Sequence, residues 1–210
     1  GAVSQWNDKS GNNHHLTQST AAYQPTYSSA FPYQCINFDG NNQVLGNTDA
    51  GLINVSDGTN TIFVVFESTN TTTSGGGQHL AGVNQRGRQY YGMNINSTTA
   101  GSGGTSFMNK SAQDYSCNIS SIPSTTKQVV IGTRNGSSRI IYDQNSLSDT
   151  KTNSSDTAQD MFSIGASWES GRTPVADYNG KIYEVIIYNN VLSTSQINQV
   201  QNYLQTKWNT

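Results

Sequence analysis

The feature that most constrains this chain is a series of short apolar segments separated by turn residues. The segment "TIFVVFES" (residues 61–68) is apolar at consecutive positions, which is typical of a central strand covered on both faces. The segment "QVVIGTRNGSSRIIYDQ" (residues 128–144) has two β-rich runs around Asn135-Gly136, a dipeptide that tolerates the positive φ of tight turns. Strands and turns that alternate without interleaved helices predict an all-β fold, a two-sheet antiparallel sandwich.

Other segments have the same strand-like character. Two of them, at residues 79–84 and 89–96, are predicted to pair, because only "QRGR" separates them. The remaining predicted strands are "CINFDG" (35–40), "TSFMN" (105–109), "DMFSIGAS" (160–167) and "GKIYEVIIYN" (180–189).

The C-terminal segment has a different period. Ser193 is a good N-cap, and Gln196 follows three residues later, as in a capping box. Apolar residues then recur at helical spacing and form one stripe, which consists of Ile197, Val200, Leu204 and Trp208. We therefore predict one helix, from about Ser193 to Trp208, packed against the sandwich.

Length and charge restrict the classes of protein. A chain of 210 residues fits a single domain over residues 1–210, and its abrupt start at Gly1 suggests excision from a larger protein. Charged residues make up 11% of the chain and the net charge is −2, so no basic patch for nucleic acid is expected. No apolar run approaches the roughly 20 residues of a membrane span, so no membrane insertion is expected.

The two cysteines allow two interpretations. Cys35 and Cys117 form one disulfide in an oxidising compartment, or they are two buried thiols. Their spacing matches no zinc pattern.

The chain resembles a known family of domains over nearly its whole length, from about Val3 to Trp208. The similar blocks are "VSQWNDKSGNNHHLTQSTAAYQPTY", "INFDG", "TIFVVF", "SIGAS" and "YNGKIYEVIIYNNVLSTSQINQVQNYLQTKW". In order and spacing they resemble the concanavalin A-like, laminin-G-like jelly-roll domains of bacterial, phage and large-virus surface proteins. The resemblance implies a jelly roll and an extracellular, cell-surface or virion-surface location within a larger protein. Such domains often have a further strand upstream of the Trp-X-Asp-X-Ser-Gly block, which this sequence lacks.

The loop after Trp6 has a scaffold interpretation and a metal-binding one. Asp8 can accept backbone hydrogen bonds in a tight turn, and Gly11 supplies a permissive φ, so a structural loop is favoured. His14 and His15 are adjacent and would point to opposite faces of a strand, so a shared metal is not expected. No cofactor is required, but a structural calcium ion is the alternative, since the fold's relatives often hold one. Its oxygen donors would be Asp8, Asp39 and Asp177.

Catalytic motifs are missing from the sequence. Glycoside hydrolysis needs a pair of carboxylates, and Glu67, Glu169 and Glu184 have no second acid at strand spacing. No G-x-S-x-G elbow is present. We therefore predict no enzyme activity; a hydrolase whose acids come from distant segments is the weaker alternative.

Two segments combine aromatic rings with polar groups, as sugar recognition requires. They cover residues 84–92 and 167–180, and the candidate ligand-binding residues are Arg88, Tyr90, Tyr91, Trp168, Glu169 and Arg172. The alternative for each segment is packing: Tyr90 or Tyr91 must face the core, and Trp168 caps the sandwich edge. Trp6 and Trp208 are assigned to packing near the termini.

Two functions follow from these patterns. The first is a non-catalytic carbohydrate-binding or adhesion module whose partner is a glycan or polysaccharide on a surface. The second is a structural module of a virion, phage tail or cell-surface assembly, whose partners are other subunits.

Overall fold

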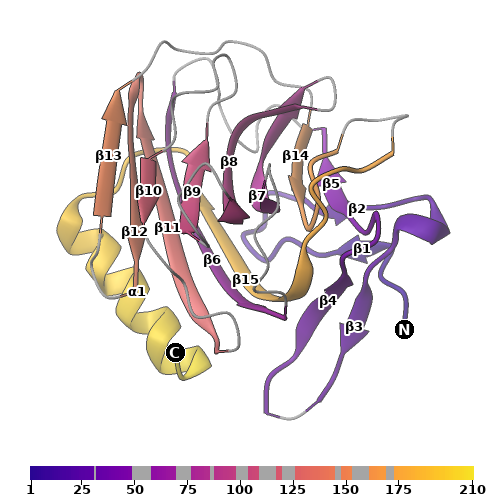
Figure 1. The fold of residues 1–210 in the computed structure, drawn as a ribbon. Coiled ribbons are helices and arrows are strands. Elements are labelled where there is room, and N and C mark those ends of the chain that lie inside the picture. The colour runs from indigo at the N-terminus through magenta and orange to yellow at the C-terminus, as the bar shows by residue number, and fades with distance from the viewer. Residues whose placement is uncertain are drawn as a thin grey trace.

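A computed structural model shows a sandwich of two antiparallel sheets with one helix on its outside (Figure 1). The structure describes residues 1–30, 32–48, 58–69, 77–85, 88–97, 104–108, 117–119, 126–144, 148–152, 161–168 and 173–210. The predicted all-β sandwich with a C-terminal helix is confirmed.

The first sheet combines the N-terminal strands, strands from the middle of the chain and one later strand, at residues 161–164. The predicted strands at residues 79–84 and 89–96 are neighbours in it and pair antiparallel. Its described strands are, in spatial order, β1 (Gln5–Trp6), β2 (Leu16–Thr17), β5 (Leu45–Asn47), β14 (Met161–Ile164), β7 (Gln78–Gln85), β8 (Arg88–Ser97), β9 (Gly104–Met108) and β10 (Cys117–Ile119).

The second sheet has the predicted central strand, β6 (Thr59–Ser68), in its middle. Its described strands are, in spatial order, β13 (Ser148–Thr152), β12 (Ser138–Asp143), β11 (Gln128–Asn135), β6 (Thr59–Ser68), β15 (Asn179–Tyr188), β4 (Cys35–Asp39) and β3 (Thr26–Ser28). A short 3₁₀ helix, η1 (Ala21–Tyr23), precedes β3.

The hairpin of β11 and β12 differs from the prediction by one residue. Asn135 pairs with Ser138, so the two turn residues are Gly136 and Ser137 rather than Asn135 and Gly136. Gly136 has the positive φ, +58°, and its N–H donates to the carbonyl of Gly58 at 2.8 Å. This hydrogen bond stabilises Gly136 as the first turn residue, so Asn135 is the last residue of β11.

Strand β6 is covered on both faces, as its consecutive apolar residues predict. Ile62, Val64 and Phe66 face the core between the two sheets. Phe63 and Val65 face a second apolar cluster, which lies under the helix. Each of these side chains is at most 1% exposed.

The helix α1 (Thr194–Trp208) begins at the predicted cap. The Ser193 side chain accepts from the Gln196 N–H, and the Gln196 side chain accepts from the Ser193 N–H, so the capping box is complete. Most of the predicted stripe is buried, at Ile197, Leu204 and Trp208, while Val200 is partly buried. Gln201 is also buried, which the apolar pattern does not predict; its Nε2 donates to the Gln144 carbonyl at 2.9 Å.

Trp208 fixes the end of α1 to β15. Its Nε1 donates to Glu184 Oε2 at 2.6 Å, and its ring lies 5.3 Å from the Tyr183 ring and 5.8 Å from the Tyr33 ring. The predicted packing role of Trp208 is confirmed. Trp6 is partly buried and packs against the core between the sheets.

Cys35 is a free, buried thiol, and its burial raises its pKa. Cys117 lies in β10, and its side chain is outside the described residues. Within the described part of the chain, no helix has the length and apolar character needed to cross a membrane.

Candidate functional site

A hollow beside Trp168 brings an aromatic ring together with polar side chains. It has a volume of about 370 Å³. Its wall comes from β1, β2, β5 and the segment after β14, and includes Gln5, Thr17, Gln18, Ser19, Thr48 and Trp168. None of the described residues that line it is an acid or a base. We call it the Trp168 hollow.

Trp168 is held beside the first sheet by a short bridge and by a glycine. Ser167 pairs with Val175 through two backbone hydrogen bonds of 2.8 and 3.0 Å. A Cβ at Gly46 in β5 would lie 3.2 Å from Cε3 of Trp168 and 2.8 Å from Sδ of Met161. The missing side chain at Gly46 therefore makes room for the indole, which stays partly exposed.

Gln18 supplies a buried amide to the wall of the hollow. It is 1% exposed, and its Oε1 accepts from the Thr20 N–H at 2.9 Å. Its Nε2 has no hydrogen-bond partner among the described residues. A buried donor of this kind is normally satisfied by a protein group or by ordered water.

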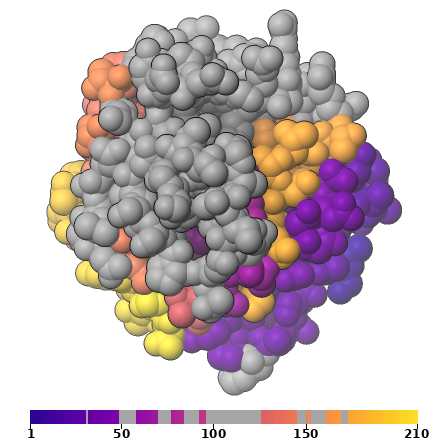
Figure 2. All heavy atoms as spheres, viewed as in Figure 1, coloured from indigo at the N-terminus to yellow at the C-terminus, as the bar shows by residue number. Residues whose placement is uncertain are grey.

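Figure 2 shows that the N-terminal residues (indigo to violet) and the segment around residues 173–180 (orange) form one continuous surface at the right of the view. The residues that line the Trp168 hollow come from two parts of the chain more than a hundred residues apart, within 4–48 and 161–168. The sequence pattern indicates Trp168 but not its polar neighbours in β1 and β2. Those strands have two residues each, too short for a periodic signal.

The other predicted ligand-binding residues cannot be placed in the hollow. Glu169 and Arg172 lie outside the described residues. Arg88, Tyr90 and Tyr91 lie in β8, and their side chains are outside the described part of the structure.

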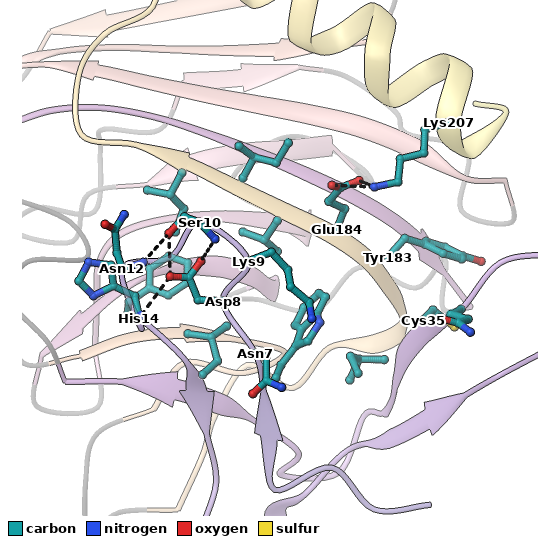
Figure 3. A pocket seen from close by; sticks show the side chains of 18 of the residues that line it. Asn7, Asp8, Lys9, Ser10, Asn12, His14, Cys35, Tyr183, Glu184 and Lys207 are labelled. Atoms are coloured by element: carbon teal, nitrogen blue, oxygen red, sulfur yellow. Dashed lines mark hydrogen bonds and ion pairs between the residues drawn. The ribbon is translucent and has the colours of Figure 1, made fainter.

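A larger hollow, of about 560 Å³, lies along β15 (Figure 3). Its apolar wall includes Trp6, Leu16, Tyr27, Val185 and Ile187. In Figure 3 the N-terminal loop with Asp8 and His14 lies on one side of β15, and Glu184 and Lys207 lie on the other, beside α1. We call it the β15 groove.

Asp8 is the hydrogen-bond acceptor at the centre of the N-terminal loop. It accepts from the Ser10 N–H at 2.8 Å, from Ser10 Oγ at 2.7 Å and from the His14 N–H at 3.1 Å. The bonds from Ser10, followed by the one from His14, lower the pKa of Asp8 despite the opposing effect of burial. Gly11 adopts φ +90°, as expected for a turn. These contacts support the scaffold interpretation of the loop.

Asp39 and Asp177 lie close together, where β4 and β15 meet. Burial raises the pKa of Asp177, and the charge of Asp39 adds to this effect, whereas a hydrogen bond from the Asn42 backbone opposes it. Asp177 Oδ1 is buried and has no hydrogen-bond partner among the described residues. Asp8 does not join this pair, because the described residues contain no group of three His, Cys, Asp or Glu side chains fit for a metal.

Both glutamates in the described residues form an ion pair with a lysine. Glu67 contacts Lys181 Nζ at 2.8 Å and accepts from the Tyr183 hydroxyl at 2.8 Å. Burial alone would raise the pKa of Glu67, but these two hydrogen bonds and the positive charges of Lys181 and Lys127 together outweigh it and lower the pKa. Glu184 pairs with Lys207 at 3.0 Å and accepts from Trp208. A general acid in glycoside hydrolysis needs a raised pKa, so the lowered pKa of Glu67 does not favour that role.

A buried histidine in β7 makes a contact that the sequence does not predict. His79 Nε2 lies 3.1 Å from the Ser163 carbonyl and 3.4 Å from Ser163 Oγ. Burial lowers the pKa of His79 to about 4, although hydrogen bonds with Ser163 and Asn94 oppose the shift. The ring is therefore neutral at pH 7. Because His79 and Ser163 are both 0% exposed, the pair has a structural role in the first sheet.

Comparison with solved structures supports the fold. A sialidase from Trypanosoma rangeli, solved with sialic acid, aligns with a TM-score of 0.66 and 14% identity over 99% of this chain and 32% of that chain. The chain thus spans about a third of that sialidase. Domain 4 of AbnA, a GH43 extracellular arabinanase from Geobacillus stearothermophilus solved with arabinotriose, aligns with a TM-score of 0.61 and 16% identity. That alignment covers 84% of this chain and 81% of the domain.

A heptameric SAP-like pentraxin from Limulus polyphemus aligns with a TM-score of 0.54 and 12% identity, over 68% of this chain and 69% of that chain. No protein-family model matches the chain, and the search of curated proteins found no match. At these identities the similarity shows a shared β-sandwich fold.

Proposed function

We propose that the chain is a non-catalytic carbohydrate-binding module of a larger surface or extracellular protein, and that a glycan binds in the Trp168 hollow. The observation that carries the proposal is the partly exposed indole beside amide and hydroxyl side chains. An indole face stacks on the C–H face of a sugar ring, while amides and hydroxyls exchange hydrogen bonds with sugar hydroxyls.

The composition of the hollow supports binding without catalysis. Its described lining residues offer no carboxylate, and glycoside hydrolysis needs two. Gln5, Thr17 and Thr48 offer amide and hydroxyl groups that can exchange hydrogen bonds with sugar hydroxyls. Two of the aligned structures were solved with saccharides, sialic acid and arabinotriose, which agrees with a glycan as the ligand class.

Trp168→Ala should weaken glycan binding by roughly 1–3 kcal/mol, the scale of losing an aromatic anchor. The wild type would first be screened on a glycan array, and the affinity of a hit would then be measured by calorimetry. Tyr203→Ala is the matched control, because Tyr203 is 51% exposed on α1 and does not line the hollow. The melting temperature of each variant is recorded as well. If Trp168→Ala lowers stability but leaves affinity unchanged, Trp168 is a packing residue.

We also propose a structural calcium ion, with Asp39 and Asp177 as its carboxylate ligands. The buried, unpartnered Oδ1 of Asp177 beside a second carboxylate suits a hard cation, which prefers oxygen ligands. Asp8 is left out of this set, because its carboxylate already accepts three hydrogen bonds within its own loop.

Asp177→Asn should abolish any rise in melting temperature on adding calcium, whereas Asp8→Asn should keep it. When calcium is removed by a chelator, the raised pKa of Asp177 makes stability depend on pH. The carboxyl stabilises the fold at pH values below its pKa in the unfolded chain, and this contribution is lost as the pH rises through its pKa in the folded chain. Asp177→Asn should therefore flatten the acidic part of the stability–pH curve. Wild-type melting that is insensitive to calcium would refute the metal proposal, and a calcium response retained in Asp177→Asn would refute this donor set.

A further inference from the structure

Strand β15 has a free edge over its C-terminal half. It pairs with β4 only from Asn179 to Ile182, because β4 begins at Cys35. On its other side it continues to pair with β6 as far as Tyr188. On the side away from β6, residues Glu184–Tyr188 make no backbone hydrogen bond to another described segment. In an antiparallel sheet the backbone N–H and C=O groups of successive residues point alternately toward the two neighbouring strands. Every second residue of this stretch therefore presents unpaired N–H and C=O groups at the free edge.

The β15 groove lies along this edge. Val185 and Ile187 turn toward the core between the sheets, and Trp6 and Leu16 continue that apolar wall. Tyr27 adds a ring that is 42% exposed. The hollow of about 560 Å³ falls within the range of ligand pockets.

The charges around the groove are balanced. Its described lining holds two lysines, Lys9 and Lys207, two acids, Asp8 and Glu184, and one histidine, His14. Asp8 is held by its loop, and Glu184 is paired with Lys207. The groove therefore selects for apolar side chains and backbone hydrogen-bonding groups rather than for a charged ligand.

We propose that the β15 groove accepts an extended strand of another polypeptide, which adds to the second sheet along Glu184–Tyr188. The strand would continue the row that β4 begins, with apolar side chains at alternate positions packing on Val185, Ile187 and Tyr27. Main-chain hydrogen bonds to a sheet edge supply affinity in such complexes, and side-chain pockets supply specificity. The N-terminal loop and the end of α1 flank the edge on its two sides (Figure 3), which favours a single strand over the edge of a second sandwich.

This site is independent of the proposed glycan site. Trp6 and Leu16 line the β15 groove, whereas their neighbours Gln5 and Thr17 line the Trp168 hollow. Because side chains alternate across a strand, the same two short strands serve both hollows. Loss of one binding activity therefore leaves the other measurable.

The test uses the 210-residue chain and a soluble synthetic peptide in which valine alternates with threonine and lysine. Binding is followed by tryptophan fluorescence, because Trp6 and Trp208 line the groove, and by amide hydrogen exchange of Glu184–Tyr188. We expect saturable binding with slowed exchange in that stretch. The same peptide with N-methyl groups at alternate residues should bind at least about tenfold more weakly, because it loses hydrogen bonds to the edge.

Tyr27→Ala should weaken binding of the valine peptide by about fivefold to tenfold, because it removes an exposed ring of the groove without opening the core. Val175→Ala, at an exposed apolar side chain (46%) that does not line the groove, should bind like the wild type. Equal binding of the methylated peptide, or unchanged exchange in Glu184–Tyr188, would overturn the proposal. Sedimentation that shows a dimer with this stretch already protected would instead assign the edge to a second copy of the chain.

Discussion

Gly165→Ala should lower the free energy of unfolding by roughly 2–6 kcal/mol, as the sum of backbone strain and overpacking. Gly165 adopts φ +83°, in a region that L-residues rarely occupy. A Cβ at this position would overlap the ring of Phe38, which is 1% exposed and lies in the core between the sheets. The backbone cannot easily move away, because the Gly165 carbonyl accepts from the Tyr178 N–H at 2.7 Å. Urea unfolding with a two-state fit measures the change.

Gly11→Ala is the matched control for this substitution. Gly11 has a similar φ, +90°, but a Cβ there would meet nothing within 4 Å. It should therefore show the strain alone, about 1–2 kcal/mol. Equal losses in the two variants would mean that the contact with Phe38 contributes nothing.

Leu204→Ala should cost roughly 2–5 kcal/mol, the range for removing a buried leucine side chain. Leu204 is 1% exposed and belongs to the apolar cluster that joins α1 to Phe63, Val65 and Ile131 of the second sheet. Truncation leaves a cavity between a helix and a rigid sheet, which can relax only in part. The expected readout is a lower urea midpoint with an unchanged m-value.

Asn202→Ala is the control for the helix. Asn202 is exposed on α1, so its replacement should change stability by less than about 0.5 kcal/mol. Gln205 is less suitable, because its Nε2 donates to the Gln144 carbonyl at 3.3 Å. If Leu204→Ala and Asn202→Ala had equal effects, the assignment of the buried face of α1 would be wrong.

The elements that the sequence predicts well are those whose signal is local. The capping box at Ser193 and the stripe through Leu204 define α1, because a helix start and an amphipathic face depend on residues a few positions apart. Strand β6 is equally clear, since its consecutive apolar residues require cover on both faces.

Features that depend on tertiary contacts are not predicted. Strands β1 and β2 have two residues each and exist because they pair with each other and with β5. Arg134 and Arg139 would be expected at the surface, yet each is 1% exposed, opposite one another in the β11–β12 hairpin. The Trp168 hollow is predicted only in part for the same reason. Trp168 can be identified in the sequence as a candidate, but Gly46 and Gln18 come next to it only when the chain folds.

The most direct test of the central claim is the affinity of one glycan, chosen from the array, for the wild type, Trp168→Ala and Tyr27→Ala. These two aromatic residues line different hollows, so the pair of variants locates the binding site. Binding in the Trp168 hollow predicts a loss of roughly 1–3 kcal/mol for Trp168→Ala and wild-type affinity for Tyr27→Ala. Full affinity in Trp168→Ala together with a loss in Tyr27→Ala would contradict the account and place the glycan in the β15 groove.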